Sequence, residues 1–308
     1  MQESGKYDVV IVGGGPAGLS AGIYTARARL NGLLVERGVV GGQIINTEWV
    51  ENYPGIESVG GIGLTEIMHK QAAKFGLETV IAEVTGIEII DDRKLVKTTK
   101  GDFIANAVII TGGSERQKLG IPGEAEYTGK GVSYCATCDG AFFRDKPVAV
   151  VGGGNAAITE ALELTKFASK ITVIHRRDEL RATKILQEKA FAEPKIEVLW
   201  DTVIDEITGE TFVGKLKVHN VKTDEKSDLD VSGVFMAVGF KPNTGYLEGV
   251  VKLDSIGSVV VSDKMETGVP GIYAAGDIRS NSIRQVIAAA GDGAVAAVNV
   301  ERYISGLH

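Results

Sequence analysis

Cysteine and histidine are scarce in this sequence, which contains two cysteines and four histidines among 308 residues. Two cysteines cannot build the disulfide framework of small secreted proteins. A zinc site needs about four ligands, but the chain has no second cysteine pair and its histidines show no ligand spacing with the two thiols. We therefore expect neither a disulfide scaffold nor a metal site.

Long apolar runs and an excess of positive charge are also absent. The apolar stretch VIAAAGDGAVAAVNV is broken by Gly291, Asp292 and Gly293, which argues against a membrane span. The first residues, MQESGKYDVVIVGGG, contain no basic region that leads into a long apolar stretch. A net charge of -7 gives no footprint for nucleic acid or an anionic membrane surface. We expect a globular cytoplasmic protein that binds neither nucleic acid nor membrane.

Glycine, by contrast, is abundant, since 40 glycines are about twice the usual share. Many lie in an internal repeat, in which DVVIVGGGPAGLSAGIYTARARLNGLLVERG from Asp8 matches PVAVVGGGNAAITEALELTKFASKITVIHRRD from Pro147. Each copy predicts a buried strand, a glycine-rich turn, a helix and a second strand. The glycines fit the dinucleotide fingerprint, which gives a tight turn, room for a pyrophosphate and a helix N-terminus that faces its charge.

The repetition makes this fingerprint specific. One such motif is weak evidence because glycines also serve ordinary turns, but two copies in the same context indicate two dinucleotide sites. The expected contact residues are Gly13, Gly15, Pro16, Ala17 and Gly18 in the first copy, and Gly152, Gly154, Asn155, Ala156 and Ala157 in the second.

The chain is long enough for about two domains, and its 44% hydrophobic content can bury a full core. Short alternating strands with turn signals follow each copy of the repeat. We expect an α/β protein with two Rossmann-like dinucleotide-binding domains, each a parallel sheet with helices and a small antiparallel meander. The second domain, residues 118–243, is inserted into the first, residues 1–117 and 244–308. The turn-rich crossings suit a hinge as well as a rigid connection.

The end of the second strand indicates which dinucleotide each site holds. In the first copy Glu36 ends LLVE, where a carboxylate can accept hydrogen bonds from a ribose with free hydroxyls. In the second copy the aligned residue is His175, and three arginines follow it: Arg176, Arg177 and Arg181. Cations in place of a carboxylate suit a 2′-phosphate, so the second site is predicted to bind NADPH.

The first site is then expected to hold FAD. Asp277, in TGVPGIYAAGD, follows a predicted strand where a carboxylate could bind ribityl or ribose hydroxyls. The helix that begins near Arg284 would direct its N-terminus at the flavin ring.

The two cysteines form a Cys-x-x-Cys pair in SYCATCDG, at Cys135 and Cys138. A disulfide across two residues closes so short a loop that it constrains little of the unfolded chain. With zinc disfavoured, a redox dithiol is the remaining interpretation. The pair lies shortly before Gly152 and therefore belongs to the NADPH domain.

The motifs CATCDG, GGGPAG, GGGNAA, HRRDELRA and YAAGD with RQV together resemble those of the low-molecular-weight thioredoxin reductases of bacterial and archaeal type, over essentially the whole chain. The resemblance implies a homodimeric FAD enzyme that takes electrons from NADPH and reduces the disulfide of thioredoxin. By the same resemblance, Cys138 faces the flavin, Cys135 attacks the partner disulfide, and Asp139 is the nearby acid. If the pair opens a helix, Cys135 is expected to be the more exposed thiol.

Further expected FAD contacts come from the same resemblance and are Arg37, Gly41, Gly42, Gln43, Asn52, Gly112, Gln285 and Val286. Two departures stand out. The sequence Thr-Gly-Gly at 111–113 replaces the Ala-Thr-Gly of many relatives, and Ser133-Tyr134 before the first cysteine could alter which partner docks.

Alternative functions remain at this point. The same scaffold can serve an NADPH-independent dithiol oxidase, an NADPH-responsive redox sensor, or a reductase of another small disulfide carrier. Turnover with NADPH and a disulfide acceptor separates the first two from a reductase, whereas nothing in the sequence identifies the carrier.

Overall fold

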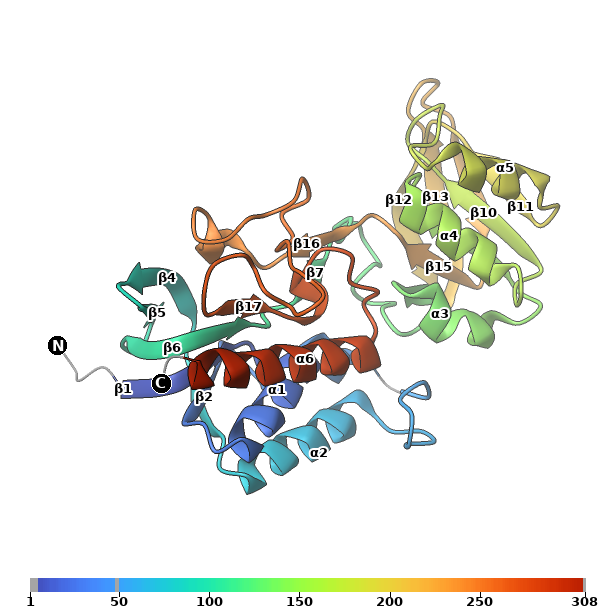
Figure 1. Ribbon diagram of the computed structural model, residues 1–308. Coiled ribbons are helices and arrows are strands. Elements are labelled where there is room, and N and C mark those ends of the chain that lie inside the picture. The colour runs from blue at the N-terminus through green and yellow to red at the C-terminus, as the bar shows by residue number, and fades with distance from the viewer. Residues whose placement is uncertain (1–4, 48–49, 307–308) are drawn as a thin grey trace. The chain divides into compact units, whose positions relative to one another are not determined.

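The computed structural model describes residues 5–47 and 50–306, and Figure 1 shows the course of the chain. The chain divides into two compact units, a first unit of residues 1–115 and 241–308 and a second unit of residues 116–240. Each unit contains parallel strands, helices and an antiparallel meander. The expected fold of two Rossmann-like domains, the second inserted into the first, is confirmed.

The first unit is built on a seven-stranded sheet in the order β3-β2-β1-β6-β5-β4, with β17 also paired to β6. The pairs β1–β2, β1–β6, β2–β3 and β6–β17 are parallel, and β4 and β5 add the antiparallel meander. The strands are β1 (Gly5–Val12), β2 (Gly32–Glu36), β3 (Glu78–Ile81), β4 (Val84–Ile90), β5 (Arg93–Thr98), β6 (Phe103–Ile110) and β17 (Ile272–Ala274). The helical segments are α1 (Pro16–Arg27), η1 (Gly42–Asn46), α2 (Gly61–Lys74), η3 (Gly245–Leu247), η4 (Gly276–Ile278) and α6 (Val286–Ser305).

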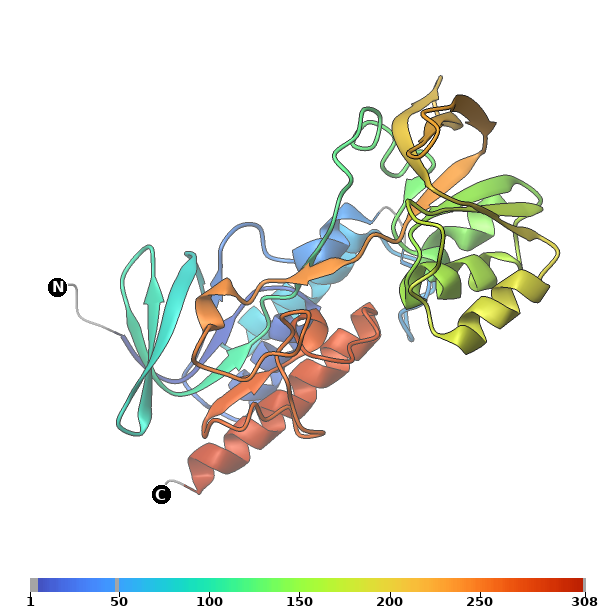
Figure 2. The same ribbon diagram turned by 90° about the horizontal axis from the view of Figure 1, so that it is seen from above.

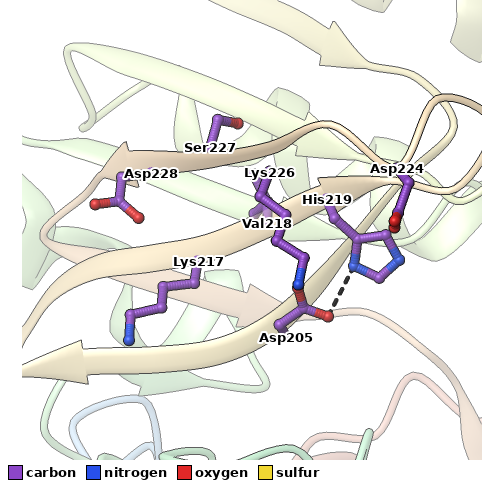
Figure 3. A pocket seen from close by; sticks show the side chains of 8 residues that line it. All are labelled: Asp205, Lys217, Val218, His219, Asp224, Lys226, Ser227 and Asp228. Carbon is purple, nitrogen blue, oxygen red and sulfur yellow. Dashed lines mark hydrogen bonds and ion pairs between the residues drawn. The ribbon is translucent and has the colours of Figure 1, made fainter.

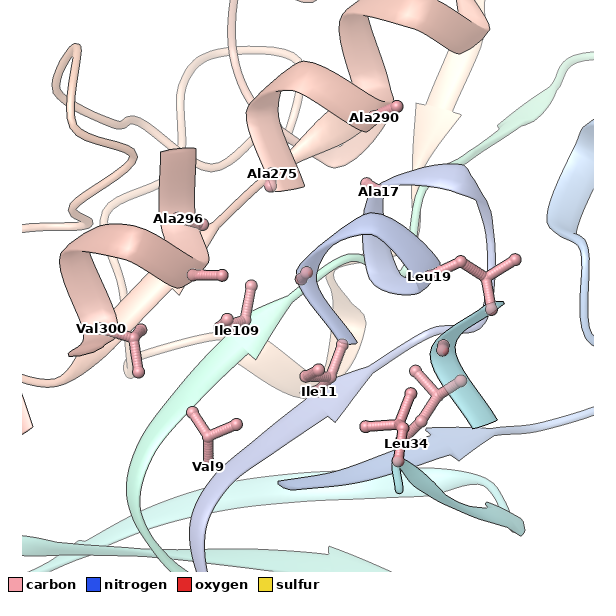
Figure 4. Packing of buried hydrophobic residues seen from close by; sticks show 14 of the residues in the cluster. Val9, Ile11, Ala17, Leu19, Leu34, Ile109, Ala275, Ala290, Ala296 and Val300 are labelled. Atoms are coloured by element: carbon pink, nitrogen blue, oxygen red, sulfur yellow. The ribbon is translucent and has the colours of Figure 1, made fainter. Parts of the chain in front are cut away.

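Alternating side chains of β1 supply two cores, one on each face of this sheet. Val9 and Ile11 belong to a buried cluster that includes residues of α1, α2 and α6, part of which Figure 4 shows. Val10 and Val12 belong to a second cluster, which includes Ile87 of the β4–β5 meander. Helices therefore cover one face of the sheet, and the meander closes the other.

Helix α6 lies along α1 (Figure 2), and Gly293 allows the two helices to approach closely. A Cβ at Gly293 would lie 2.0 Å from the carbonyl oxygen of Ala17, far inside van der Waals contact. The last helix of the chain thus packs directly on the helix that follows the first glycine turn.

The second unit contains a fully parallel five-stranded sheet in the order β11-β10-β9-β15-β8 and an antiparallel meander β12-β13-β14. One core lies on the side of α4 and α5, and another lies toward the meander. The strands are β8 (Val132–Ser133), β9 (Pro147–Val151), β10 (Lys170–Ile174), β11 (Ile196–Leu199), β12 (Thr202–Gly209), β13 (Val213–Asn220), β14 (Lys226–Asp230) and β15 (Gly233–Met236). The helical segments are α3 (Ala136–Asp139), η2 (Gly140–Phe143), α4 (Asn155–Leu164) and α5 (Lys184–Ala192).

The chain passes between the units at β7 (Ser114–Arg116) and β16 (Phe240–Pro242), which pair with each other as a two-stranded sheet. Within residues 5–47 and 50–306, no helix has the length and hydropathy of a membrane span.

Candidate functional site

The first glycine turn joins β1 to α1 and leaves the helix N-terminus open. Gly15 is the N-cap of α1, no side chain caps it, and Pro16 occupies the first turn. A Cβ at Gly18 would lie 1.9 Å from the carbonyl oxygen of Gly13, so the helix can meet the turn only through glycine. A Cβ at Gly15 would meet only the Cα of Gly42, at 3.7 Å. The open side of the turn therefore offers backbone N–H groups to an anionic group.

The carboxylate of Glu36 lies beside this turn because β2 runs parallel to β1. Its Oε2 accepts a hydrogen bond from the backbone N–H of Gly14 at 2.6 Å, and its Oε1 accepts one from Gly38 at 2.9 Å. The adjacent Arg37 pairs with Glu115 at 2.5 Å, and this hydrogen bond raises the pKa of the Arg37 guanidinium. A carboxylate and a guanidinium thus stand at the end of β2, next to the turn.

Several expected flavin contacts from distant parts of the sequence meet in the first unit. The backbone N–H of Gly41 donates to the carbonyl oxygen of Gly14 at 2.9 Å, which places the Gly41–Gln43 segment against the glycine turn. The Asn52 side-chain amide donates to Oε1 of Gln285 at 3.1 Å, across 233 positions of sequence. Gln285 is the uncapped N-cap of α6, whose first residue is Val286.

Asp277 lies in η4, just before α6, and its Oδ1 accepts a hydrogen bond from the Ser282 hydroxyl at 3.0 Å. Arg284, between Ser282 and α6, has a backbone φ of 54°. These residues and Gln285 form the segment that leads into the α6 N-terminus.

A hollow of about 470 Å³ is lined by residues 51–57, which include Asn52.

Tyr246 is a residue of this region that the sequence did not indicate. Its hydroxyl oxygen is buried and has no hydrogen-bond partner among the described residues, and it would lie 3.2 Å from a Cβ at Gly112. Burial raises the pKa of the Tyr246 phenol, and the charge of Arg37 lowers it by less. A buried polar atom that lacks a partner beside Gly112 is what a bound polar ligand would satisfy.

The second glycine turn repeats this arrangement between β9 and α4. Gly154 is the N-cap of α4, no side chain caps it, and a Cβ there would meet nothing within 4 Å. Ala157 takes the place of Gly18 and is fully buried, whereas Ala156 is exposed. The Asn155 side-chain oxygen accepts a hydrogen bond from the backbone N–H of Thr183 at 2.8 Å. A second helix N-terminus is therefore open to an anionic group.

His175 aligns with Glu36 in the repeat and was expected to contribute positive charge at the end of its strand, but the structure buries it. It is 4% exposed, and its ring lies so close to Gly153 that a Cβ there would be 2.3 Å from it. Its Nε2 lies 3.0 Å from the carbonyl oxygen of Glu179, so Nε2 carries the proton. Burial lowers the pKa of His175, and the neighbouring arginines lower it further. His175 therefore supports the turn as a neutral ring instead of facing solvent as a cation.

The positive charge at this turn comes from the arginines. Arg176, Arg177 and Arg181 are all exposed. The backbone N–H of Arg181 donates to the carbonyl oxygen of Gly153 at 2.7 Å, which folds the segment after β10 back onto the turn.

Cys135 and Cys138 form a disulfide with a Cα–Cα distance of 5.3 Å. Cys135 is the N-cap of α3, and its sulfur accepts a hydrogen bond from the backbone N–H of Cys138 at 3.2 Å. Cys138 is exposed, whereas Cys135 is half-buried. The expectation that Cys135 is the more exposed thiol is therefore wrong, because its capping position draws it against the start of the helix.

Asp139 follows the pair and is held by a neighbouring hydroxyl. The Ser133 Oγ donates to Oδ2 of Asp139 at 2.6 Å and accepts from the backbone N–H of Cys135 at 3.1 Å. A disulfide, a carboxyl group and an open dinucleotide turn thus belong to one unit, which can take up two electrons and exchange them with another disulfide.

A separate hollow of about 680 Å³ lies on the β12–β14 meander (Figure 3), where His219 Nδ1 is 2.8 Å from Asp205 Oδ1. None of its lining residues belongs to a glycine turn or to the cysteine segment. No group of three or more His, Cys, Asp or Glu side chains suited to a metal occurs among the residues that the structure describes.

Comparison with known proteins gives consistent matches. A family model described as pyridine nucleotide-disulphide oxidoreductase matches residues 7–293. The chain is 47% identical over 310 residues to the thioredoxin reductase of Bacillus subtilis (strain 168), covering 100% of this chain and 98% of that one. It is 46% identical over 308 residues to the thioredoxin reductase of Peptoclostridium litorale, covering 98% of each.

Among solved structures, the crystal structure of thioredoxin reductase from Streptococcus pyogenes MGAS5005 matches with a TM-score of 0.93 at 45% identity, covering 99% of this chain and 100% of that one. The sequence matches and this structural match extend over both glycine turns and the cysteine pair. The chain therefore belongs to the low-molecular-weight, bacterial-type thioredoxin reductases, within the pyridine nucleotide-disulphide oxidoreductases.

Proposed function

We propose that the chain passes two electrons from NADPH, through FAD and the Cys135–Cys138 disulfide, to the disulfide of thioredoxin. As a member of the thioredoxin reductases it is an oxidoreductase with FAD and NADPH as cofactors. The observation that carries the proposal is the disulfide at the start of α3, in the same unit as a dinucleotide turn flanked by arginines. This combination supports electron flow from a nicotinamide to a disulfide.

The first unit is proposed to hold FAD. Its open α1 N-terminus fits a pyrophosphate, and the buried Tyr246 hydroxyl beside Gly112 fits a polar ligand. The chemistry that FAD supplies when bound is the conversion of a hydride into two electrons for a disulfide. The proposed contacts are Gly13, Gly15, Pro16, Ala17, Gly18, Glu36, Arg37, Gly41, Gly42, Gln43, Asn52, Gly112, Asp277, Arg284, Gln285 and Val286.

The second unit is proposed to bind NADPH. The α4 N-terminus would receive the pyrophosphate, and the exposed arginines would bind the 2′-phosphate as charged donors. His175 would act indirectly, because its buried ring packs against Gly153 and stabilises the glycine turn. The proposed contacts and supports are Gly152, Gly154, Asn155, Ala156, Ala157, His175, Arg176, Arg177 and Arg181.

The cysteine pair is proposed to work by thiol–disulfide exchange. The Cys135 thiolate attacks one sulfur of the acceptor disulfide, and the second acceptor sulfur leaves. Cys138 then attacks the Cys135 sulfur, which restores the intramolecular disulfide and releases the acceptor as a dithiol. Asp139 supplies a proton to a departing thiolate, directly or through water. The assignment of roles to the two sulfurs is taken from the family resemblance.

Two further properties belong to this proposal. We propose a homodimer, in line with the family resemblance. We also propose the cytoplasm as the place of action, because a thiol pair that must return to its reduced form works best in a reducing compartment.

The test of this function is a coupled assay under anaerobic conditions with purified enzyme, NADPH and oxidised thioredoxin. We expect one NADPH to be oxidised for every two thioredoxin thiols formed. A glutaredoxin-like protein at the same concentration serves as the competing acceptor. Faster reduction of that protein would identify it, and not thioredoxin, as the preferred substrate. Oxygen consumption with a dithiol and without NADPH, or NADPH binding without turnover, would overturn the reductase proposal.

A further inference from the structure

Ser133 connects the sheet of the second unit to the residues around the disulfide. Its hydroxyl oxygen accepts the backbone N–H of Cys135 at 3.1 Å, and its hydrogen is donated to Asp139 Oδ2 at 2.6 Å. The latter distance is typical of a hydroxyl bonded to a carboxylate. Ser133 is only 5% exposed and Asp139 is half-buried, so this bond is partly shielded from competing water.

The two partners of this bond differ in how firmly the fold holds them. Ser133 ends β8 and is paired with Phe235 of β15 within the five-stranded sheet. Asp139 ends the four-residue helix α3 and is half-buried. So short a helix has few internal hydrogen bonds to fix its last side chain. The sheet can therefore impose an orientation on the carboxyl group through Ser133.

We propose that Ser133 is a positioning residue for thiol–disulfide exchange, which holds one oxygen of Asp139 and so fixes the carboxyl group beside the cysteine pair. The inference rests on the proposed role of Asp139 as the acid. As Cys138 attacks the Cys135 sulfur, the proton of the Cys138 thiol passes to Asp139. The bond between Cys135 and the acceptor breaks, and the departing acceptor sulfur takes that proton from Asp139. The electron pair stays with the departing sulfur, and the enzyme regains its disulfide.

A serine suits both protonation states of this carboxyl group. The hydroxyl has one donor and two acceptor lone pairs, of which the Cys135 N–H takes one. It donates to Asp139 when the group is a carboxylate, and its second lone pair can accept from the protonated acid. The contact therefore persists through the proton transfer.

A purely local role for Ser133 is the simpler alternative. Serine hydroxyls often accept from the N–H two residues onward and thereby stabilise a turn. That role explains the contact with Cys135 but gives the bond to Asp139 no part in the reaction. The two roles predict different results when Ser133 and Asp139 are changed together.

The experiment follows a single turnover between the pre-reduced FAD-loaded enzyme and oxidised thioredoxin, by thioredoxin fluorescence or by quenched thiol counting. We expect Asp139→Asn to slow the exchange about 100-fold, as for loss of a general acid. Ser133→Ala should slow it about tenfold, and Ser133→Thr, which keeps the hydroxyl, should stay within about twofold of wild type. In the double variant, Ser133→Ala should add less than about twofold to Asp139→Asn.

Three controls separate this role from damage to the fold. Ser227→Ala removes the same atom from an exposed position on β14 and should leave the rate unchanged. FAD content and NADPH affinity should be equal in all variants. Asp139→Glu keeps an acid but displaces it by one methylene, and we expect it to be about tenfold slow even if Ser133→Ala does not fold.

The outcomes distinguish the role of Ser133 from the proposed roles of Asp139 and of the whole enzyme. Equal slowing by Ser133→Ala in the presence and absence of Asp139 would assign Ser133 to the turn alone and overturn the inference. A wild-type rate for Asp139→Glu would do the same. A wild-type rate for Asp139→Asn would instead remove the proposed acid, while failure of wild-type enzyme to reduce thioredoxin would remove the proposed function.

Discussion

The two glycine turns have the same strand–turn–helix context but differ in what stands at the end of the following strand. In the first, the Glu36 carboxylate accepts the N–H of Gly14 and so lies on the turn itself. In the second, the aligned His175 is buried under the turn, and the charge is carried by exposed arginines that follow it. The backbone thus supplies an open helix N-terminus at both turns, and the residues at the end of the following strand set the sign of the charge beside it.

A second difference is the position that the helix uses to meet the turn. The first turn has Gly18, where a Cβ would collide with the backbone, whereas the second has Ala157. The second turn therefore accommodates a methyl group at the position where the first turn has no room for one.

The largest expected effect concerns the thiols, which only the second unit carries. We expect Cys135→Ser and Cys138→Ser each to abolish thioredoxin reduction while both dinucleotides still bind. Cys138→Ser should trap a mixed disulfide with thioredoxin, detected by non-reducing electrophoresis and mass spectrometry. Cys135→Ser should trap none, but its remaining thiolate should give a long-wavelength absorbance band with the flavin. The reverse pattern would exchange the roles of the two sulfurs.

The next largest effect is expected where each helix meets its glycine turn, at Gly18 in the first unit and at Ala157 in the second. Gly18→Ala puts a methyl group 1.9 Å from the Gly13 carbonyl oxygen, so we expect loss of FAD during purification and destabilisation by about 1–3 kcal/mol. Ala157→Gly, the reciprocal change in the second turn, should keep FAD and alter only NADPH binding. Absorbance at the flavin band measures how much FAD each variant retains, and thermal unfolding measures its stability. Retention of one FAD per chain by Gly18→Ala would show that the turn can relax.

A smaller effect tests the charge difference. Arg176→Ala with Arg177→Ala should lower kcat/KM for NADPH about 10- to 100-fold, corresponding to lost hydrogen bonds between charged groups of about 1.5–3 kcal/mol. The value for NADH should change little, because the α4 N-terminus, the proposed site of the pyrophosphate that both cofactors share, is left intact. Equal losses for the two cofactors would mean that these arginines support the fold.

The smallest effect comes from His175. Since burial lowers its pKa in the folded state, the neutral ring is favoured by folding. Its contribution to stability is fully present above the unfolded-state pKa of about 6.5 and is lost as the pH falls toward the lower folded-state value. Thermal unfolding at several pH values between about 7.5 and 5 should therefore show a steeper acid loss for wild type than for His175→Gln. Parallel curves would contradict a buried neutral ring.

The fold and the two turns were predictable because their signals are local and repeated. Gly13 and Gly152 each follow an apolar strand and precede a helix, so the sequence itself contains the strand–turn–helix units that the structure has. The insertion of the second unit followed from the incomplete first repeat and from the strand before Asp277, which becomes β17.

Other features depend on contacts that no short pattern encodes. His175 lies against Gly153, onto which the segment after β10 folds back through the backbone of Arg181. The Tyr246 hydroxyl has no local signature because its neighbour, Gly112, lies far away in the sequence. The exposure of the two cysteines was misjudged because a capping side chain is drawn toward its helix whatever its chemical role.

The packing of α6 on α1 at Gly293 has a consequence for the order in which the protein is made. The first unit needs β17 and α6, which are synthesised after residues 116–240 of the second unit. Domains generally fold as units during synthesis. The unit in the middle of the chain can therefore fold first. Until β17 and α6 have been made, the apolar faces of β1, α1 and the other early elements of the first unit stay uncovered. The first unit, with its glycine turn, is thus completed only after the second unit has been made, and the early strands are most exposed to aggregation in the interval before that.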